Sequence, residues 1–436
     1  MSGNSQFAYY LQLALRSFKR NRVLTALMVL AIALGIGASM TTLTVFHVLS
    51  GDPIPDKSER LFYVQLDAAD LHGFKPGEEP ESQLTRFDAE ALLREGRAER
   101  QALMSGGNVV VTPAGGQSSK ISEARYTSEG FFDLFDTPFQ YGRGWTRTED
   151  EGRARVAVIS RELNQTLFGG GNSVGRTVRV ENVDLRIVGV LDDWRPVPRF
   201  YDLNLSRYGE PEELFVPFWT ARDIGLEHSG NRNCWADSGG DQLSATAPCA
   251  WVQYWAQMDP AQAGAYRDYL GAYSEQQRKA GRFQRPPNPR LRDVMQHLEH
   301  NKVVPNDVRL QVWLAFGFLL VCLINTVGLL LAKCLRRSSE IGVRRALGAS
   351  RRDIFLQFLV ESGTLGVAGA ALGLGLALLG LWAVRQNPAQ YAQLAHLDGT
   401  MLLTTFALSI GASVLAGLLP AWRACQVTPA IQLKSQ

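Results

Sequence analysis

The residues that could do chemistry in this 436-residue chain are few, and they do not assemble into a recognisable enzyme motif. There is no GxxxxGKS or GxxxxGKT phosphate-binding loop, and HExxH and CxxC are also missing. His297 and His300 have the spacing of two ligands on one helix face, but without a third ligand a solvated face is the better interpretation. The sequence therefore predicts a chain that is not an enzyme, with no catalytic residue, no metal and no cofactor of its own.

Two cysteines offer redox chemistry. Cys234 and Cys249 flank a loop rich in Gly, Asn and Asp, and they are the only pair in the long polar middle of the chain. If that region faces an oxidising compartment, a disulfide is favoured, and closing so short a loop would stabilise the fold by about 3 kcal/mol in the chain-entropy model. Two free thiols are the alternative.

The strongest concentration of charge lies in residues 333–353, which read KCLRRSSEIGVRRALGASRRD. A net charge of +3 is too small to indicate nucleic-acid binding, so the position of the basic residues matters more than their number. A solvated basic loop would need nothing more than arginines. The order of an acid and a glycine, paired arginines and then small residues favours a docking surface for a partner protein.

Four apolar segments must position these residues. Residues 23–49, 310–332 and 402–422 contain no Asp, Glu, Lys or Arg, and residues 355–384 contain only Glu361. About 20 apolar residues span a bilayer, so each segment is long enough, and four such runs disfavour buried helices of a soluble domain. We predict an α-helical membrane protein with four transmembrane helices and a large mixed α/β periplasmic domain inserted between helices 1 and 2.

Basic residues cluster before the first segment, between the second and third, and after the fourth, so the positive-inside rule places these parts in the cytoplasm. Both termini of this multi-pass chain are then cytoplasmic. The predicted organisation is a cytoplasmic amphipathic helix (1–22), transmembrane helix 1 (23–50), the periplasmic domain (51–308), helix 2 (309–333), a cytoplasmic loop (334–353), helix 3 (354–385), a short periplasmic connection (386–400), helix 4 (401–422) and a cytoplasmic tail (423–436).

The insert has globular composition. Alternating and β-branched runs predict strands at residues 60–66, 156–160 and 176–191, the last as a hairpin turning at Glu181 and Asn182. Residues 86–103 and 260–279 are predicted as helices, and residues 291–300 as a stalk into transmembrane helix 2.

Glu361 lies about two turns inside helix 3, where an ionisable group is costly and by default suggests function. We expect it to pair with an arginine of the preceding loop, and a purely structural carboxylate is the alternative. Small residues also recur at four-residue spacing and let helices approach closely, either within the chain or in a dimer. They are Ser362, Gly366, Gly369, Ala370 and Gly373 on helix 3, and Ser409, Ser413 and Gly417 on helix 4.

Residues 340–353 (EIGVRRALGASRRD) closely resemble the permease subunits of the MacB/FtsX-like ABC transporter superfamily. Residues 15–37 resemble the family's first membrane helix with its basic lead-in. YTSEGFFDLFDTPFQYGRGWTRTED, RVAVISRELNQTLFG and VGRTVRVENVDLRIVGVL resemble the MacB-type periplasmic core domain, and LAGLLPAWRACQVTPAIQL resembles the closing helix and tail.

This resemblance implies a permease of the bacterial inner membrane. It would dimerise with a second copy or a paralogous permease and couple to a cytoplasmic ABC ATPase that binds ATP and Mg²⁺. Because only about twenty residues precede helix 1, we expect the ATPase to be a separate chain. The resemblance assigns the ATPase contact to a coupling helix, which Gly348-Ala349-Ser350 would break before helix 3. The contact residues would be Glu340, Gly342, Arg344, Arg345, Ala346, Gly348, Ala349, Arg351 and Asp353.

The implied function is export of periplasmic substrates such as peptides or antibiotics by mechanotransmission, in contact with membrane lipid and, in a diderm bacterium, with a periplasmic adaptor and an outer-membrane factor. An FtsX-like regulator of a cell-wall hydrolase, a lipoprotein-releasing complex and a sensor share the architecture and remain alternatives.

Overall fold

The computed structural model describes residues 3–112, 119–386, 391–397 and 399–425. Parts of the predicted amphipathic helix (1–2), periplasmic connection (387–390 and 398) and cytoplasmic tail (426–436) therefore lie outside the described residues. The chain forms two compact units, one of Met1–Ser50 with Val304–Gln436 and one of Gly51–Val303. We call the first the membrane unit and the second the insert.

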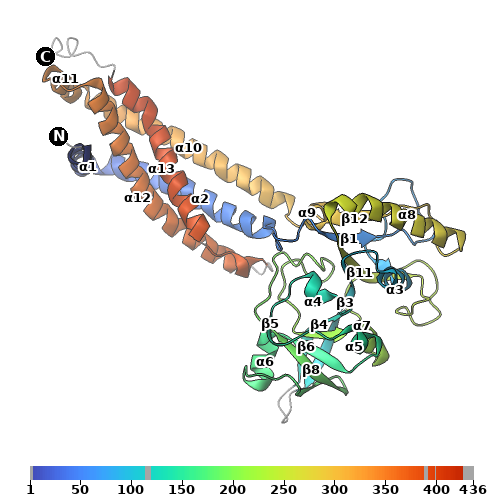
Figure 1. Ribbon diagram of the computed structural model, residues 1–436. Helices are drawn as coiled ribbons and strands as arrows, with labels where there is room; N and C mark the ends of the chain where they lie inside the picture. Colours follow the sequence, from blue (N-terminus) through green and yellow to red (C-terminus); the bar gives the residue numbers. More distant parts are fainter. Residues whose placement is uncertain (1–2, 113–118, 387–390, 398, 426–436) are drawn as a thin grey trace. The chain divides into compact units, whose positions relative to one another are not determined.

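The membrane unit consists of helices joined by short turns, with no strand in the described residues. Four of its helices are long and apolar enough to cross a membrane, which confirms the predicted class of fold. They are α2 (Arg22–Ser50), α10 (Asn306–Arg336), α12 (Arg351–Arg385) and α13 (Gly399–Cys425). The amphipathic α1 (Gly3–Arg20), the short α11 (Ser338–Ala346) and a 3₁₀ turn, η2 (Ala392–Leu394), complete the unit. Figure 1 shows α1, α11 and the beginning of α12 at the same end of this bundle.

The small residues of α12 and α13 pack against their neighbours within this chain. A Cβ atom added to Gly366 would collide with Ser413, and one added to Gly417 would collide with Ser362. Gly369 and Gly373 lie in the same way against the side chains of α2. Ser409 Oγ donates a hydrogen bond of 2.9 Å to the Gly366 carbonyl, and Ala370 is fully buried. These stripes let α12 contact α13 on one side and α2 on the other.

The insert is built on a mixed sheet, as predicted for an α/β domain. Its main path runs β12-β1-β11-β3-β4-β9-β6-β8-β5, in which β4–β9 and β6–β8 are parallel and the other neighbours are antiparallel. The strands are β1 (Leu61–Gln65), β2 (Leu84–Thr85), β3 (Arg100–Thr112), β4 (Lys120–Thr127), β5 (Phe139–Gly142), β6 (Val156–Ile159), β7 (Thr177–Val180), β8 (Val183–Leu191), β9 (Leu214–Pro217), β10 (Asn233–Cys234), β11 (Cys249–Gln257) and β12 (Arg290–Asp293). The helical segments are α3 (Arg86–Glu95), α4 (Phe131–Leu134), α5 (Arg147–Glu151), α6 (Arg161–Phe168), α7 (Phe218–Asp223), η1 (Pro260–Gln262), α8 (Ala263–Lys279) and α9 (Val294–His300).

Several local predictions for the insert can be compared with these elements. The hairpin at Glu181 and Asn182 is confirmed, because β7 pairs with β8 and Glu181 takes a positive φ of 50° at the turn. The helix predicted over residues 86–103 is wrong in its second half. It ends at Glu95, where Gly96 adopts the left-handed conformation, and residues 100–112 form β3 instead. The predicted stalk at residues 291–300 begins with β12, which pairs with β1, so its first part belongs to the sheet.

Candidate functional site

The turn between α11 and α12 follows from the local sequence. α11 ends at Ala346, and Gly348 takes a φ of +101°, a conformation that residues with a Cβ rarely adopt. Ser350 then caps α12, because its Oγ accepts the backbone N–H of Asp353 while the Asp353 carboxylate accepts the N–H of Ser350. The chain is therefore fixed in a short turn with α11 on one side and α12 on the other.

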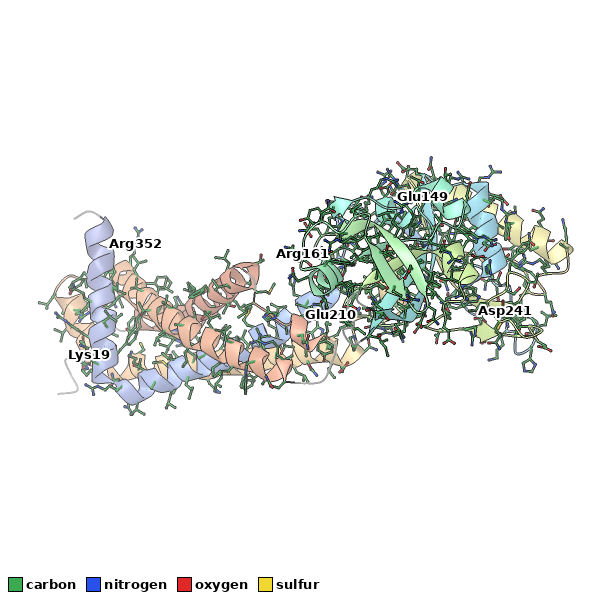
Figure 2. The ribbon with its side chains drawn as sticks, turned by 90° about the horizontal axis from the view of Figure 1, so that it is seen from below. Lys19, Glu149, Arg161, Glu210, Asp241 and Arg352 are labelled. Atoms are coloured by element: carbon green, nitrogen blue, oxygen red, sulfur yellow. A yellow bond between two sulfur atoms is a disulfide. The ribbon has the colours of Figure 1, made fainter. Side chains whose placement is uncertain are left out.

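The residues that this turn presents to solvent are apolar and basic. Leu347, the residue directly after α11, is 83% exposed, and Val343 is 55% exposed. The Leu347 N–H donates to the Val343 carbonyl at 3.0 Å, so the two residues lie one turn apart on the same side. Arg351 and Arg352 are exposed at the start of α12. We call Val343, Leu347, Arg351 and Arg352 the docking surface. Figure 2 shows Arg352 and the basic Lys19 of α1 at the same end of the bundle.

The residues assigned to the coupling helix divide into two groups. Ala346, Gly348 and Arg351 are exposed, so a partner could reach them. The others are at least partly covered and several brace the turn from inside; they are Glu340, Gly342, Arg344, Arg345, Ala349 and Asp353.

The bracing contacts are specific. Arg344 pairs with Glu340 at 2.9 Å and donates to the Gln357 side chain at 3.0 Å. Arg345 donates to the Cys425 carbonyl at 3.3 Å, which ties α11 to the end of α13. Sequence reasoning missed Val343 and Leu347. The available signal was that Val343 and Leu347 lie one turn apart and off the face that carries the buried Ile341.

Behind the docking surface, the buried carboxylate of Glu361 collects partners from three other segments. Ser17 of α1 donates a 2.6 Å hydrogen bond to Glu361 Oε1, and Lys333 Nζ of α10 lies 2.5 Å from the same oxygen. The Arg337 guanidinium, just before α11, lies 3.6 Å from Oε2. We call Ser17, Lys333, Arg337 and Glu361 the membrane ion cluster.

The arginine expected beside Glu361 is thus present as Arg337, whereas Ser17 and Lys333 are partners that sequence reasoning missed. The Lys333 and Glu361 side chains are each only 2% exposed, so the pair is almost completely removed from solvent. Replacing only one partner of such a buried ion pair costs stability, because the charge of the other partner is left without a counter-charge.

Two further contacts join α1 to the turn. Arg20 pairs with Glu340 of α11 at 3.0 Å, and the Tyr10 hydroxyl donates to Asp353 at 3.3 Å. The Arg20 pair is exposed and contributes little stability on its own. Together with the membrane ion cluster, these contacts connect α1, α10, α11 and α12 around one turn.

Neither the His297/His300 pair nor a GxSxG match in the insert forms a reactive site. The predicted solvated face is wrong for His297, whose ring is buried against Tyr63 and Trp255. Residues 171–175 match GxSxG, but Ser173 is fully buried between α6 and β7 and is not exposed at a strand-to-helix turn. In the described residues, no group of three His, Cys, Asp or Glu side chains is placed to hold a metal ion.

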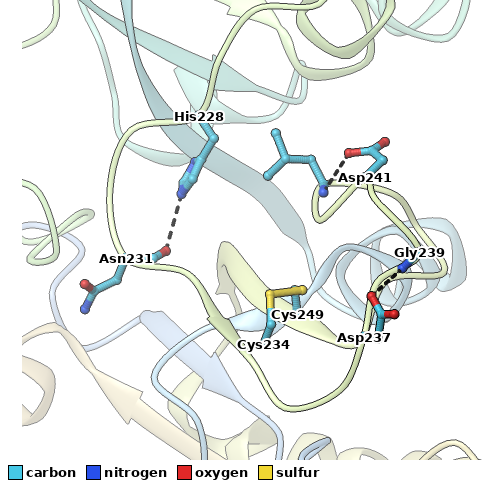
Figure 3. The surroundings of a disulfide bond; sticks show 8 residues. His228, Asn231, Cys234, Asp237, Gly239, Asp241 and Cys249 are labelled. Carbon is cyan, nitrogen blue, oxygen red and sulfur yellow. Dashed lines mark hydrogen bonds between the residues drawn. A yellow bond between two sulfur atoms is a disulfide. The ribbon is translucent and has the colours of Figure 1, made fainter.

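The Cys234/Cys249 loop is closed by a disulfide in the structure, which joins β10 to β11 (Figure 3). Polar side chains stabilise the loop locally, since Asp237 accepts the backbone N–H of Gly239. The nearby Trp251 and Trp255 are fully buried. These two tryptophans therefore belong to the core of the insert and not to a binding surface on this loop.

Family models match most of this architecture. Residues 25–261 match the MacB-like periplasmic core domain, and residues 312–429 match the FtsX-like permease C-terminal domain. The chain belongs to the MacB/FtsX-like permease family. Its membrane helices and its inserted α/β domain are the two parts that define that family.

Individual relatives are distant. The chain is 25% identical to the pyoverdine export ATP-binding/permease protein PvdT of Pseudomonas fluorescens, over 98% of this chain and 59% of that protein. It is 24% identical to the macrolide export ATP-binding/permease protein MacB of Wolinella succinogenes, over 98% of this chain and 60% of that protein. The chain therefore spans about three fifths of the length of these curated relatives. The crystal structure of the periplasmic region of MacB from Actinobacillus actinomycetemcomitans aligns with a TM-score of 0.38 at 13% identity, covering 57% of this chain and 95% of that chain.

Proposed function

We propose that this chain is the membrane permease of an ATP-driven exporter, and that its docking surface receives the movement of a cytoplasmic ABC ATPase. The observation that carries this proposal is the exposed, apolar and basic turn at Val343–Arg352, braced from inside by the chain's own side chains. Exposed leucine and valine beside arginines are typical of a surface that a partner protein covers. Family membership supports an ATPase as that partner.

The packing provides a route from the docking surface to the insert. Movement of α11 would act on the membrane ion cluster and hence on α10 and α12. α12 lies against α2 through Gly369 and Gly373. The insert, Gly51–Val303, is continuous in sequence with α2 before it and with α10 after it. ATP hydrolysis in the cytoplasm would thus reposition the insert on the other side of the membrane, where a substrate is exported without passing between the four helices.

The remaining parts of the proposal concern the assembly. ATP and Mg²⁺ would be bound by the ATPase and not by the residues described here. Two permeases, identical or paralogous, would form the membrane part in the bacterial inner membrane, with a periplasmic adaptor and an outer-membrane factor in a diderm cell. Export is supported by the relatives PvdT and MacB, which are named as pyoverdine and macrolide export proteins.

The test is charge reversal at the docking surface. We expect Arg351→Glu combined with Arg352→Glu to reduce stimulation of the ATPase in the purified complex by about tenfold or more. That factor corresponds to a loss of about 1.4 kcal/mol in the free energy of binding between permease and ATPase. Arg232→Glu combined with Arg267→Glu is the matched control, since both are exposed arginines of the insert, in the other unit of the chain. Full stimulation by the double variant, or equal loss with the control, would contradict a specific docking surface.

A further inference from the structure

The helix that precedes the first membrane span has an exposed side that the proposed coupling mechanism does not use. α1 ends at Arg20 and α2 begins at Arg22, so a single residue separates α1 from an apolar helix long enough to cross a membrane. Figures 1 and 2 show that α1 crosses the end of the membrane bundle and does not continue along it. When α2 crosses the membrane, a helix in this position lies along the membrane surface.

One side of α1 is fixed to the bundle. Ala14 and Ser17 are each only 2% exposed, and Ser17 Oγ donates to the Glu361 carboxylate at 2.6 Å. Phe18 is partly buried against the apolar core of the membrane helices, and its ring lies 5.1 Å from Lys333 Nζ. These contacts decide which side of α1 points away from the protein.

The opposite side of α1 combines basic and apolar groups. Arg16 and Lys19 are exposed and lie three residues apart, which places both on one face of the helix. Leu15 is 53% exposed beside them. α1 contains no Asp or Glu, and among the described side chains Arg20 is its one basic residue that pairs with a carboxylate, that of Glu340. The charges of Arg16 and Lys19 therefore face outward where the chain enters the membrane.

Charge and position together indicate what covers this face. Acidic phospholipid headgroups carry negative charge at the membrane surface, and basic residues next to a membrane span are attracted to them. The exposed leucine suits the same location, because its side chain can enter the apolar region while the long basic side chains reach the headgroups. We propose that Leu15, Arg16 and Lys19 form a binding site for acidic phospholipid, which we call the lipid face.

The lipid face is connected to the interior of the bundle by its own helix. Ser17, which donates to Glu361, follows Arg16 directly and lies two residues before Lys19. A lipid bound at the lipid face would therefore hold α1 in contact with the membrane ion cluster. Lipid binding can be measured without any ATPase, so failure of the docking-surface experiment would leave this proposal standing, and the reverse also holds.

The experiment uses the full chain purified in detergent and titrated with phosphatidylglycerol or phosphatidylcholine of identical acyl chains. Only the first of these phospholipids carries a net negative charge. Native mass spectrometry measures the dissociation constant of each lipid. We expect phosphatidylglycerol to bind at least tenfold more tightly, because two basic residues at the membrane surface each add several-fold in affinity for acidic lipid. Equal affinity for the two lipids would overturn the proposal.

Two double variants locate the site. Arg16→Gln with Lys19→Gln should remove the preference for phosphatidylglycerol, since glutamine keeps the helix propensity of these positions without their charge. Arg232→Gln with Arg267→Gln removes the same charge from exposed positions of the insert and should keep the full preference. An equal loss in this control would assign the effect to net charge and contradict the site.

A protein partner is the competing occupant of this face. If the α1 double variant keeps the preference for phosphatidylglycerol but loses stimulation of the ATPase, the face contacts the ATPase and the lipid proposal is wrong. Loss of the preference together with wild-type stimulation is the result that a lipid site predicts.

Discussion

Each unit of this protein buries a cluster of charged groups, and the two clusters differ in what they connect. In the insert, the fully buried Arg125 of β4 pairs with Asp202 at 2.7 Å and also with Glu212. Tyr201 donates a 2.6 Å hydrogen bond to Glu212, and Gln253 donates to Asp202 at 3.2 Å. This cluster joins two strands to the irregular segment 201–212 inside one domain.

The chemistry of the insert cluster is that of a fixed structural element. Burial by itself would raise the pKa of the Glu212 carboxyl, but the guanidinium groups of Arg125 and Arg199 outweigh it and lower that pKa to about 2. Glu212 therefore stays ionised at every physiological pH. Several donors hold it, so the cluster rigidifies its surroundings.

The membrane ion cluster instead joins helices that are remote in sequence and lies behind an exposed surface. Its carboxylate, Glu361, is the single acid shared by Ser17, Lys333 and Arg337. A shift of α11 would change these contacts directly, because Arg337 immediately precedes that helix. Buried charge thus holds an irregular segment in place within the insert, whereas in the membrane unit it joins α1, α10 and α12 with Arg337 before α11.

The largest effect is expected from removing the acid of either cluster. Glu361→Gln removes the carboxylate that pairs with Lys333 and Arg337, and Glu212→Gln leaves the buried Arg125 with Asp202 as its remaining carboxylate. We expect each substitution to destabilise its unit by about 3–5 kcal/mol. Thermal unfolding of the purified chain measures this loss. A second measurement separates the two clusters: ATPase stimulation at a temperature where both variants are folded. Only Glu361→Gln should reduce this stimulation. Equal reduction in both variants would contradict the difference in role.

The second effect concerns the disulfide. In the described residues the membrane unit has only free cysteines, Cys322, Cys334 and Cys425, whereas the insert has the Cys234–Cys249 bridge. Cys234→Ser with Cys249→Ser should destabilise the insert by about 3 kcal/mol through loop closure and leave the membrane unit unchanged. The unfolding transition of each unit, followed with and without reductant, checks this. Wild-type protein should also yield two additional thiols to alkylation after reduction. Two thiols that react before reduction would contradict the bridge.

The smallest effect is a pH dependence confined to the insert. The pKa of Asp150 rises from its ordinary value of 3.8 to about 8, because burial and Glu129 disfavour the charged form. Its contribution to stability is therefore complete below about pH 4 and is lost as the pH rises through 8. Asp150→Asn should raise the melting temperature of the insert by a few degrees at pH 9 and change it little at pH 4. A similar rise with the exposed Asp193→Asn would assign the effect to net charge instead.

The sequence predicted those elements that depend on the local pattern of apolar and polar residues. Long apolar runs showed the four membrane helices, and Glu181 with Asn182 between two alternating runs showed the hairpin of β7 and β8. The prediction failed where the structure of a segment depends on residues that are distant in the sequence. Residues 100–112 have a helical pattern at their start but form β3, because β4 and β11 pair with them on either side.

The candidate site shows the same division. Glu361 stood out as an acid inside an apolar run, yet its partners Ser17 and Lys333 come from helices far away in the sequence. Leu347 is one apolar residue among many in the sequence, and only the structure shows that it is 83% exposed. Asp150 resembled a favourable acid in the first turn of α5, and only the fold shows that it is buried.

The central claim is that the docking surface contacts an ABC ATPase, and site-specific photo-cross-linking at position 347 tests it most directly. A benzophenone side chain replacing Leu347 should give a covalent adduct with the nucleotide-binding domain of an ABC ATPase, identified by mass spectrometry from cell membranes. The same probe replacing the exposed Val367 in the apolar middle of α12 should give no such adduct. An ATPase adduct from Val367 but not from Leu347, or none from either position in an assembled complex, would contradict the account.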